Sequence, residues 1–292
     1  MLPSTEAVNA ETHDLDLLDA GGIVALLARE QVFAAQAVAR ATPAVARAVD
    51  AIVARLRGGG TLHYVGAGTS GRLATLDAAE CPPTFGTPPA LVVAHVAGGA
   101  DALARAIEGA EDDAAAGEAE MRGNVASRDA VVGISASGGA PYVVAAVRAA
   151  RAIGALTIAL SSDARSALAG AAEMTIAIES GPEPIAGSTR LKAGTAQKLV
   201  LNALSTATMV RLGKVYDNLM VDVVATNRKL HARAIRLVCE IANVDAERAE
   251  SLLAAAGGSV KVAVVMARRG VDADTARVLL DGAGGFLRPV IA

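Results

Sequence analysis

Residues 66–72 have the sequence GAGTSGR and lie between an apolar run, Thr61–Val65, and a helical pattern, Arg72–Ala79. A glycine-rich turn between a strand and a helix gathers backbone N–H groups at the helix N-terminus, where an anion binds favourably. A second small polar turn, Ser135–Gly139, follows the apolar run 129–134 and precedes a predicted helix over 141–153. The first turn therefore predicts a phosphate site, and its repetition predicts an α/β fold.

The other apolar runs complete a predicted sheet. Further strands are expected at 90–96, 155–160 and 173–178, and almost all the runs are apolar throughout rather than alternating. Continuous apolar strands are typical of a parallel sheet that helices cover on both faces. We therefore predict a doubly wound, mostly parallel sheet with flanking helices and a small C-terminal helical module.

The predicted helices divide the chain into four parts. They cover 22–41, 43–56, 102–122, 193–212 and a stretch from Val221. Three short amphipathic segments then follow, separated by breaks that resemble helix caps at 243–245, 257–259 and 270–272. The expected division is an N-terminal helical segment (1–50), a ligand-binding α/β domain (51–220), a connecting helix (221–239) and a three-helix module (240–292).

Composition narrows the class of protein. The 292 residues carry a formal net charge of −3, and 53% are hydrophobic but only 2% aromatic, so nucleic-acid binding is not expected. Cys81 and Cys239 form no disulfide or metal-binding pattern, and two cysteines fit a reducing compartment. Residues 1–16 are polar and acidic, unlike a signal peptide, and no uninterrupted apolar run reaches the roughly 18 residues of a membrane span. We expect a cytoplasmic protein with no membrane segment, no metal and no other cofactor.

The first turn formally matches the dinucleotide fingerprint G-x-G-x-x-G. That motif expects an acidic residue at the end of the next strand, but the second strand ends in Ala94-His95-Val96, which favours a sugar phosphate. Both turns are expected at one edge of the sheet, because ligands of open α/β sheets bind at the carboxyl ends of the strands. The alternative is that the Ser and Thr residues only cap the following helices. The predicted ligand-binding residues are Gly68, Thr69, Ser70, Ser135, Ser137 and Gly138.

Two groups of carboxylates are candidates for acid–base chemistry. Glu80 follows an apolar helix and precedes Cys81–Pro83, where the chain is expected to leave the helix. A poorly hydrated carboxyl at such a corner would have a raised pKa and stay protonated, as a general acid requires. The second group is the cluster 108–113, in which Glu108 and Glu111 are three residues apart on a predicted helix. For that cluster a solvated helix face is the ordinary interpretation.

Two long blocks carry a resemblance to a known family. Residues 77–86 read DAAECPPTFG and residues 187–195 read GSTRLKAGT, and shorter matching pieces cover 65–71, 108–113 and 209–222. On these motifs the chain resembles the N-acetylmuramic acid 6-phosphate etherases, a family of the sugar isomerase (SIS) domain superfamily. The resemblance implies an SIS-type sheet, a sugar-phosphate substrate and a homodimer with sites near the subunit interface. It also implies that Glu80 and Glu111 are the catalytic pair, and that Glu108 is not.

The family's reaction explains why two carboxyl groups are needed. The enzymes remove D-lactate from the 3-ether of N-acetylmuramate 6-phosphate and leave N-acetylglucosamine 6-phosphate, in the recycling of cell-wall sugar. The resemblance implies that Glu80 donates a proton to the departing lactyl oxygen of this carbon–oxygen lyase. Glu111 is then the base, at the C2 hydrogen or at the attacking water. No metal is implied.

The chain departs from the family pattern at several positions. Gly139 and Ala140 stand where an arginine and a threonine are usual after the second turn, so a cation and a hydroxyl near the phosphate are lost. Ala74 replaces a glycine, and Val8 and Ala10 replace an arginine and a proline. Two other functions stay open: a non-enzymatic sugar-phosphate sensor, as found among SIS-domain regulators, and an isomerase of another sugar phosphate.

Overall fold

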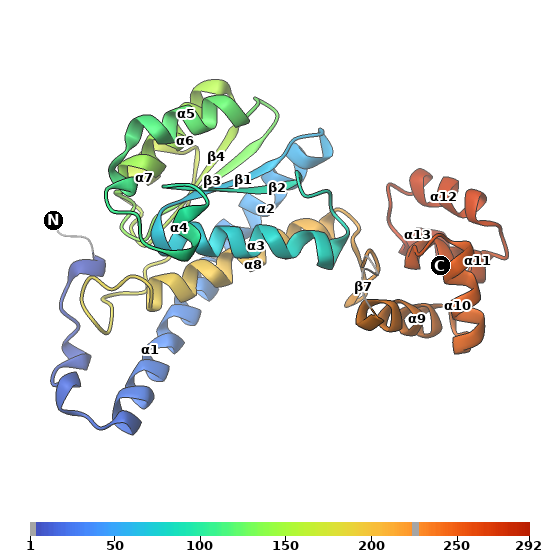
Figure 1. Ribbon diagram of the computed structural model, residues 1–292, viewed down its shortest axis with the longest axis horizontal. Helices are drawn as coiled ribbons and strands as arrows, with labels where there is room; N and C mark the ends of the chain where they lie inside the picture. The colour runs from blue at the N-terminus through green and yellow to red at the C-terminus, as the bar shows by residue number, and fades with distance from the viewer. Residues whose placement is uncertain (1–3, 224–227) are drawn as a thin grey trace. The chain divides into compact units, whose positions relative to one another are not determined.

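A computed structural model describes residues 4–223 and 228–292 (Figure 1). The chain forms two compact units. The first contains residues up to Ala79 together with Ala90–Ser205, and the second contains Glu80–Pro89 with Thr206–Ala292.

The first unit is built on a five-stranded sheet whose strand order is β2-β1-β3-β4-β5. All four neighbouring pairs are parallel, which confirms the predicted doubly wound sheet. β1 and β3 are buried at every position, as expected for strands covered on both faces; β3 is apolar throughout, and β1 is apolar apart from His63. The strands are β1 (Leu62–Gly66), β2 (Val92–Val96), β3 (Ala130–Ile134), β4 (Leu156–Ser161) and β5 (Met174–Ala177).

Helices cover both faces of this sheet. In Figure 1, α5 (Ala114–Asn124), α6 (Pro141–Ile153) and α7 (Ala167–Ala171) lie above it. α2 (Thr42–Arg57), α3 (Gly68–Phe85) and α8 (Lys192–Arg211) lie below it. The upper face is closed by an apolar cluster that joins Val65, Val131 and Ala159 of the strands to Val143 and Val147 of α6. The sheet is therefore covered by helices on both faces, and its carboxyl edge is left for the loops that follow the strands.

The N-terminal segment contains three short 3₁₀ turns and one long helix. The turns are η1 (Ser4–Glu6), η2 (Ala10–Thr12) and η3 (Leu15–Leu17), and Asp19 caps α1 (Ala20–Arg40) by accepting the Gly22 N–H at 2.7 Å. Among the described residues, α1 is the one straight helix long and apolar enough to cross a membrane. The bent pair α10 (Ala246–Ala255) and α11 (Val260–Arg269) passes the same test only if taken as one span. Only 17% of the most apolar 18-residue stretch of α1 is buried in the chain, so a large apolar face of this helix is exposed.

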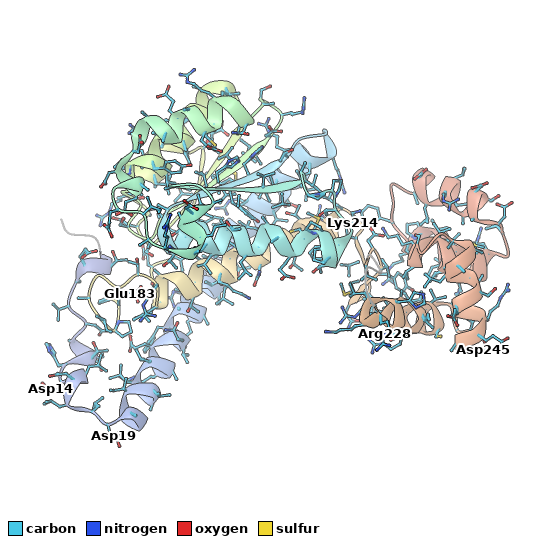
Figure 2. All side chains as sticks on the ribbon, in the orientation of Figure 1. Asp14, Asp19, Glu183, Lys214, Arg228 and Asp245 are labelled. Atoms are coloured by element: carbon cyan, nitrogen blue, oxygen red, sulfur yellow. The ribbon has the colours of Figure 1, made fainter. Side chains whose placement is uncertain are left out.

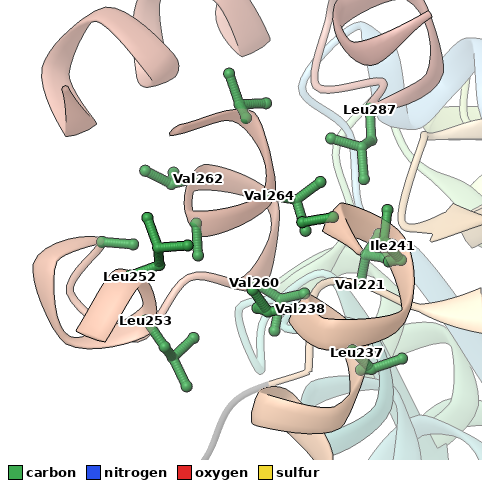
Figure 3. Packing of buried hydrophobic residues seen from close by; sticks show 14 of the residues in the cluster. Val221, Leu237, Val238, Ile241, Leu252, Leu253, Val260, Val262, Val264 and Leu287 are labelled. Atoms are coloured by element: carbon green, nitrogen blue, oxygen red, sulfur yellow. The ribbon is translucent and has the colours of Figure 1, made fainter. Parts of the chain in front are cut away.

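The second unit is a small helical module with its own core (Figure 3). Val221, Leu237, Leu253, Val264 and Leu287 meet in this core. Because α9 contributes as much as the helices after it, the compact module begins earlier than the expected boundary at residue 240. Its elements are β6 (Val215–Tyr216), β7 (Leu219–Met220), α9 (Arg228–Ala242), α10 (Ala246–Ala255), α11 (Val260–Arg269), α12 (Ala273–Gly282) and α13 (Arg288–Ile291).

The predicted helix breaks in this module are confirmed by side-chain caps. Asp245, Ser259 and Asp272 accept the N–H groups of Arg248, Val262 and Thr275 at the starts of α10, α11 and α12. The expected helix from Val221 is wrong at its start, because Val221 and Asp222 form a turn. The part of that expectation over 224–227 lies outside the described residues, and α9 begins at Arg228.

Two other predictions of local structure are wrong. The expected helix 102–122 is divided into α4 (Asp101–Ala104), η4 (Ala110–Asp112) and α5, because Gly109 has a left-handed φ of 74° and Asp113 starts a new helix as its N-cap. The chain also does not leave the helix at Cys81, since α3 continues through Pro82 and Pro83 to Phe85. The two prolines lie in its last turn, where they remove two N–H donors while the Pro82 carbonyl still accepts the Gly86 N–H at 2.9 Å.

Candidate active site

The two polar turns open into one pocket at the carboxyl edge of the sheet. β1 and β3 are neighbours, while β2 lies on the other side of β1, so the strand order reverses at this point. Doubly wound proteins bind ligands where the strand order reverses. The pocket has a volume of about 480 Å³. Its lining includes Gly68, Thr69, Ser70, Ser135, Ser137 and Gly139.

The first turn contributes mainly backbone groups. Gly68 begins α3 with a φ of 53°, and a Cβ on Gly71 would lie 2.6 Å from Val96 Cγ1 and 2.9 Å from the Gly66 carbonyl oxygen. Glycine is therefore required where this helix starts against the sheet. The hydroxyl of Ser70 donates to Gln197 Oε1 of α8 at 2.9 Å, and both side chains are buried. Ser70 thus offers the pocket its N–H at the helix N-terminus rather than its side chain.

The second turn contributes hydroxyl groups. Ser135 Oγ accepts the Gly138 N–H at 3.1 Å, and Ser137 Oγ accepts the Gly139 N–H at 3.2 Å. Because each oxygen is an acceptor in these bonds, its own O–H can donate to a ligand. Gly138 has a φ of 69°, and a Cβ there would lie 2.3 Å from both Cβ and Oγ of Ser166. Gly138 shapes this turn, although it is not among the residues that line the pocket.

A third wall of the pocket comes from the N-terminal segment, and the sequence analysis missed it. Glu6, Gly187 and Thr189 line the pocket, and the Gly187 N–H donates to the Thr5 carbonyl at 3.0 Å. A glutamate in an irregular segment gives no signal of such a role, and the block 187–195 indicates only a family motif, not a place in the pocket.

A buried polar network fixes this wall. Glu30 Oε2 accepts hydrogen bonds from Lys192 Nζ at 2.9 Å and from Asn9 Nδ2 at 3.0 Å, and the Lys192 ammonium also donates to the Pro182 carbonyl. The carboxylate of Glu183, labelled in Figure 2 near the start of α8, accepts the N–H groups of Lys192 and Ala193. Burial raises the pKa of Glu183, although these bonds and the ammonium oppose the shift.

Glu111 lies in this pocket, next to the two turns. It belongs to η4, and Asp112 lines the pocket beside it. The interruption at Gly109 separates Glu111 from the helix face on which it was expected, and Asp113 caps α5 by accepting the Ala116 N–H at 2.9 Å. Glu108 lines a smaller adjoining hollow instead. Of these four acidic residues, Glu111 and Asp112 line the main pocket, Glu108 lines the smaller hollow, and Asp113 caps a helix.

Glu80 has surroundings unlike those expected from the sequence. It is exposed near the C-terminal end of α3, whereas the neighbouring Cys81 is 2% exposed. It is not one of the residues that line the pocket of Glu111 in the described chain. The expectation of a dry Glu80 is therefore wrong for a single chain, because α3 continues past it and no corner encloses it.

The charge of the pocket is unusual for a phosphate site. Its described lining holds three carboxylates, from Glu6, Glu111 and Asp112, and no lysine, arginine or histidine. Gly139 and Ala140, which replace the usual arginine and threonine, both line it. Within the described ranges, no group of three or more His, Cys, Asp or Glu side chains could hold a metal ion. A phosphate would here be held by N–H groups, hydroxyls and the dipoles of α3 and α6.

Comparison with known proteins first identifies the class. Residues 44–151 match the glucokinase regulatory protein N-terminal SIS domain, and residues 111–207 match the SIS domain. A phosphoheptose isomerase from Francisella tularensis shares the fold with a TM-score of 0.53 at 20% identity, over 65% of this chain and 98% of that one. A putative phosphosugar isomerase from Bacteroides fragilis gives 0.51 at 23% identity, over 68% and 93%. The first unit is thus an SIS domain.

Curated relatives then identify the family. N-acetylmuramic acid 6-phosphate etherase from Deinococcus radiodurans is 50% identical over 91% of this chain and 88% of its own length. The protein of the same name from Brucella anthropi is 50% identical over 98% of this chain and 94% of its own length. The chain belongs to the N-acetylmuramic acid 6-phosphate etherase family.

Proposed function

We propose that this protein cleaves the D-lactyl ether of N-acetylmuramic acid 6-phosphate and releases D-lactate and N-acetylglucosamine 6-phosphate. The protein is a carbon–oxygen lyase, because its relatives are named N-acetylmuramic acid 6-phosphate etherases and cleavage of this ether is a lyase reaction. The observation that carries the proposal is Glu111 in one pocket with two turns that suit a phosphate group. A sugar anchored by its phosphate at those turns brings its reacting carbons to a carboxylate.

The phosphate is held without a side-chain cation from the described pocket lining. The α3 N-terminus supplies N–H groups at Gly68, Thr69 and Ser70, and Ser135 and Ser137 supply hydroxyls. Charge-assisted hydrogen bonds of this kind are about twice as strong as neutral ones. The binding energy fixes the open-chain sugar, whose C1 aldehyde acidifies the C2 hydrogen.

Glu111 is the proposed base that removes the C2 hydrogen. The C3–oxygen bond then breaks and leaves an unsaturated aldehyde, and Glu80 donates a proton to the departing lactyl oxygen. Water adds at C3 to complete the reaction, with Glu111 as the second candidate base at this step. A positioned proton transfer contributes about 10²–10⁴ in rate, so replacing either glutamate should nearly abolish turnover.

We further propose that the active form is a homodimer in which Glu80 reaches the site from the second copy. Two observations support this: Glu80 is exposed in a single chain, and Val24, Val32 and Phe33 of α1 are exposed apolar side chains. Exposed apolar side chains on one helix are suited to cover by a partner. Burial by the second copy would also supply the dry surroundings that a proton donor needs. A cytoplasmic location fits the proposed role in cell-wall sugar recycling.

Lactate release by the purified protein tests the reaction. With N-acetylmuramic acid 6-phosphate in ¹⁸O-labelled water, label is expected at C3 of the amino sugar and not in lactate. Label in lactate would contradict cleavage between C3 and oxygen.

A mixture of two inactive variants tests the shared site. Glu80→Gln and Glu111→Gln are each expected to be inactive. Mixed dimers contain one site with both glutamates intact, so re-associated mixtures should recover about a quarter of the wild-type activity. No recovery after verified exchange of subunits would place both carboxylates in one chain.

The second candidate is a sugar-phosphate sensor without turnover, which the match to the glucokinase regulatory protein domain favours. Tight binding of N-acetylmuramic acid 6-phosphate with no lactate release would support it. Interconversion of a sugar phosphate without lactate would instead indicate an isomerase.

A further inference from the structure

Two hollows meet at Glu111. The pocket described above is joined by a smaller one of about 180 Å³, and both are lined by Ala67, Gly68 and Glu111. The smaller hollow also contains Arg72, from the first turn of α3, together with Glu108. A ligand group that leaves the main pocket past Glu111 therefore enters a space with a guanidinium in its wall.

Arg72 is held in place by the loop that leads to Glu111. Its Nε donates to the Leu103 carbonyl at 3.2 Å, and its Nη2 donates to the Arg105 carbonyl at 3.0 Å. None of the ion pairs among the described residues involves Arg72. A guanidinium has five N–H donors in a fixed fork, so donors are left for a ligand in the hollow. The Arg72 guanidinium is therefore held by backbone carbonyls, and it makes no ion pair with a carboxylate of the described residues.

The proposed substrate carries two negative groups, the 6-phosphate and the carboxylate of the lactyl ether. We propose that the smaller hollow is the subsite for the lactyl carboxylate, and that Arg72 binds this carboxylate; the inference rests on the proposed function. The main pocket has hydroxyls and helix ends for the phosphate, while the smaller hollow has the arginine. The ether oxygen then lies where the two hollows meet, beside Glu111.

The rest of the lining fits a lactyl group. Ala102, Ala106 and Ile107 give the hollow an apolar part that suits the lactyl methyl. Glu108 opposes a bound carboxylate by charge repulsion, but it is exposed, and solvent screens its charge. The product N-acetylglucosamine 6-phosphate has no lactyl group, so Arg72 distinguishes substrate from product by a contact that only the substrate makes.

The test compares two substrates in the full-length enzyme: N-acetylmuramic acid 6-phosphate and its analogue with the lactyl carboxyl converted to a primary amide. The wild type should bind the amide about 10- to 100-fold more weakly than the acid, because a charge-assisted bidentate contact is lost. Arg72→Gln should weaken binding of the acid by a similar factor and leave binding of the amide nearly unchanged. Arg72→Lys should recover part of the preference, since it keeps the charge without the fork.

Two controls separate recognition from support of the loop. Inhibition by N-acetylglucosamine 6-phosphate should be unchanged within about twofold in Arg72→Gln, because this product lacks the group in question. Arg105→Gln, at an exposed arginine outside the hollow, should behave as the wild type on both substrates. Glu108→Gln should strengthen binding of the acid but not of the amide.

The outcomes that overturn the inference are distinct from failure of the proposed function. If Arg72→Gln weakens the binding of acid and amide equally, or weakens the binding of the product as well, Arg72 only supports the loop. If Arg72→Gln binds the acid as tightly as the wild type does, the carboxylate subsite lies elsewhere. If the wild type releases no lactate from N-acetylmuramic acid 6-phosphate, the proposed function fails; binding of acid and amide, measured by calorimetry, would still decide the role of Arg72.

Discussion

The turns after β1 and β3 occupy equivalent positions in the fold, yet they are built differently. In the first turn the Ser70 hydroxyl is used inside the protein, where it bonds Gln197, and the pocket receives backbone N–H groups. In the second turn the Ser135 and Ser137 oxygens accept N–H groups of their own turn and keep their hydroxyl hydrogens for the pocket. The first turn thus presents the start of a helix to the pocket, and the second presents side-chain hydroxyls. The presence of a serine in such a turn therefore does not by itself show that its hydroxyl group faces the phosphate.

The largest effect on stability and turnover is expected at Gly138. Each turn has one glycine with a positive φ, but Gly138 is crowded by Ser166 and Gly68 has open space around it. Gly138→Ala brings a Cβ to 2.3 Å from Ser166 and should cost about 2–4 kcal/mol, with a loss of turnover of about 100-fold or more. Gly68→Ala meets no atom within 4 Å and should cost about 1 kcal/mol. Urea denaturation and kcat/KM measure both.

The control for these variants is Gly59→Ala, at a left-handed glycine that also has open space and lies outside the pocket. It should match Gly68→Ala in stability and the wild type in activity. Equal stabilities of the Gly138 and Gly68 variants would refute the steric difference between the turns.

The next effect separates the two serine roles. Ser135→Ala should raise KM about 10-fold, because a hydrogen bond to the phosphate is lost. Ser70→Ala should leave kcat/KM within about twofold but lower stability by about 1–2 kcal/mol, since Gln197 Oε1 loses its donor in a buried site. Steady-state kinetics and denaturation midpoints, measured on the same preparations, test whether the two serines have these different roles. A large KM increase in Ser70→Ala would mean that its hydroxyl reaches the substrate.

A smaller effect is expected from restoring the cation that the second turn lacks. Gly139 is exposed, does not need a positive φ, and a Cβ there meets only Ser137 Oγ at 3.5 Å. Gly139→Arg should therefore fold normally and lower KM by about 3- to 10-fold, and the gain should shrink at high salt. Gly139→Gln is the uncharged control. An unchanged KM in Gly139→Arg would show that the turn needs no added charge.

The smallest effect concerns the strands that lead to the turns. His63 of β1 pairs in register with Val131 of β3, and its Nδ1 lies 3.0 Å from His95 Nε2. Burial, and then the charge of His95, lower the pKa of His63, although the Asp129 carboxylate opposes this. The unfolded chain therefore binds the proton more readily, and stability falls as the pH drops below about 6.5.

His63→Val gives β1 the same residue that β3 has at the paired position, Val131. The variant should lose less stability than the wild type between pH 7.5 and 5.5, as measured by denaturation midpoints. His231→Gln, at an exposed histidine of α9, is the control and should keep the wild-type pH dependence. An equal loss in His63→Val would assign the acid sensitivity to other groups.

The sheet and its two turns could be predicted because their signals are local. Buried strands such as Leu62–Gly66 are apolar at almost every position, and the glycines that start α3 lie directly after one. The division of the helix at 102–122 was missed, although Gly109 and the capping Asp113 were both visible. A left-handed glycine and a helix cap divide this stretch, and neither is required by the residue types alone.

The parts of the site that could not be predicted depend on contacts between distant residues. The partner of Ser70 is 127 positions away, and Glu6 faces the pocket because Thr5 bonds Gly187. Neither sequence position carries a pattern of its own. The exposure of Glu80 is of the same kind, since Pro82 and Pro83 are compatible with a corner and equally with the last turn of a helix.

The network that joins Asn9, Glu30 and Lys192 has a practical consequence for anyone who produces this protein. Glu6 lines the pocket and Asn9 belongs to the network, so deletion of residues 4–12 would disturb the site while leaving the sheet intact. Such a preparation would give a normal circular dichroism spectrum and a poor enzyme.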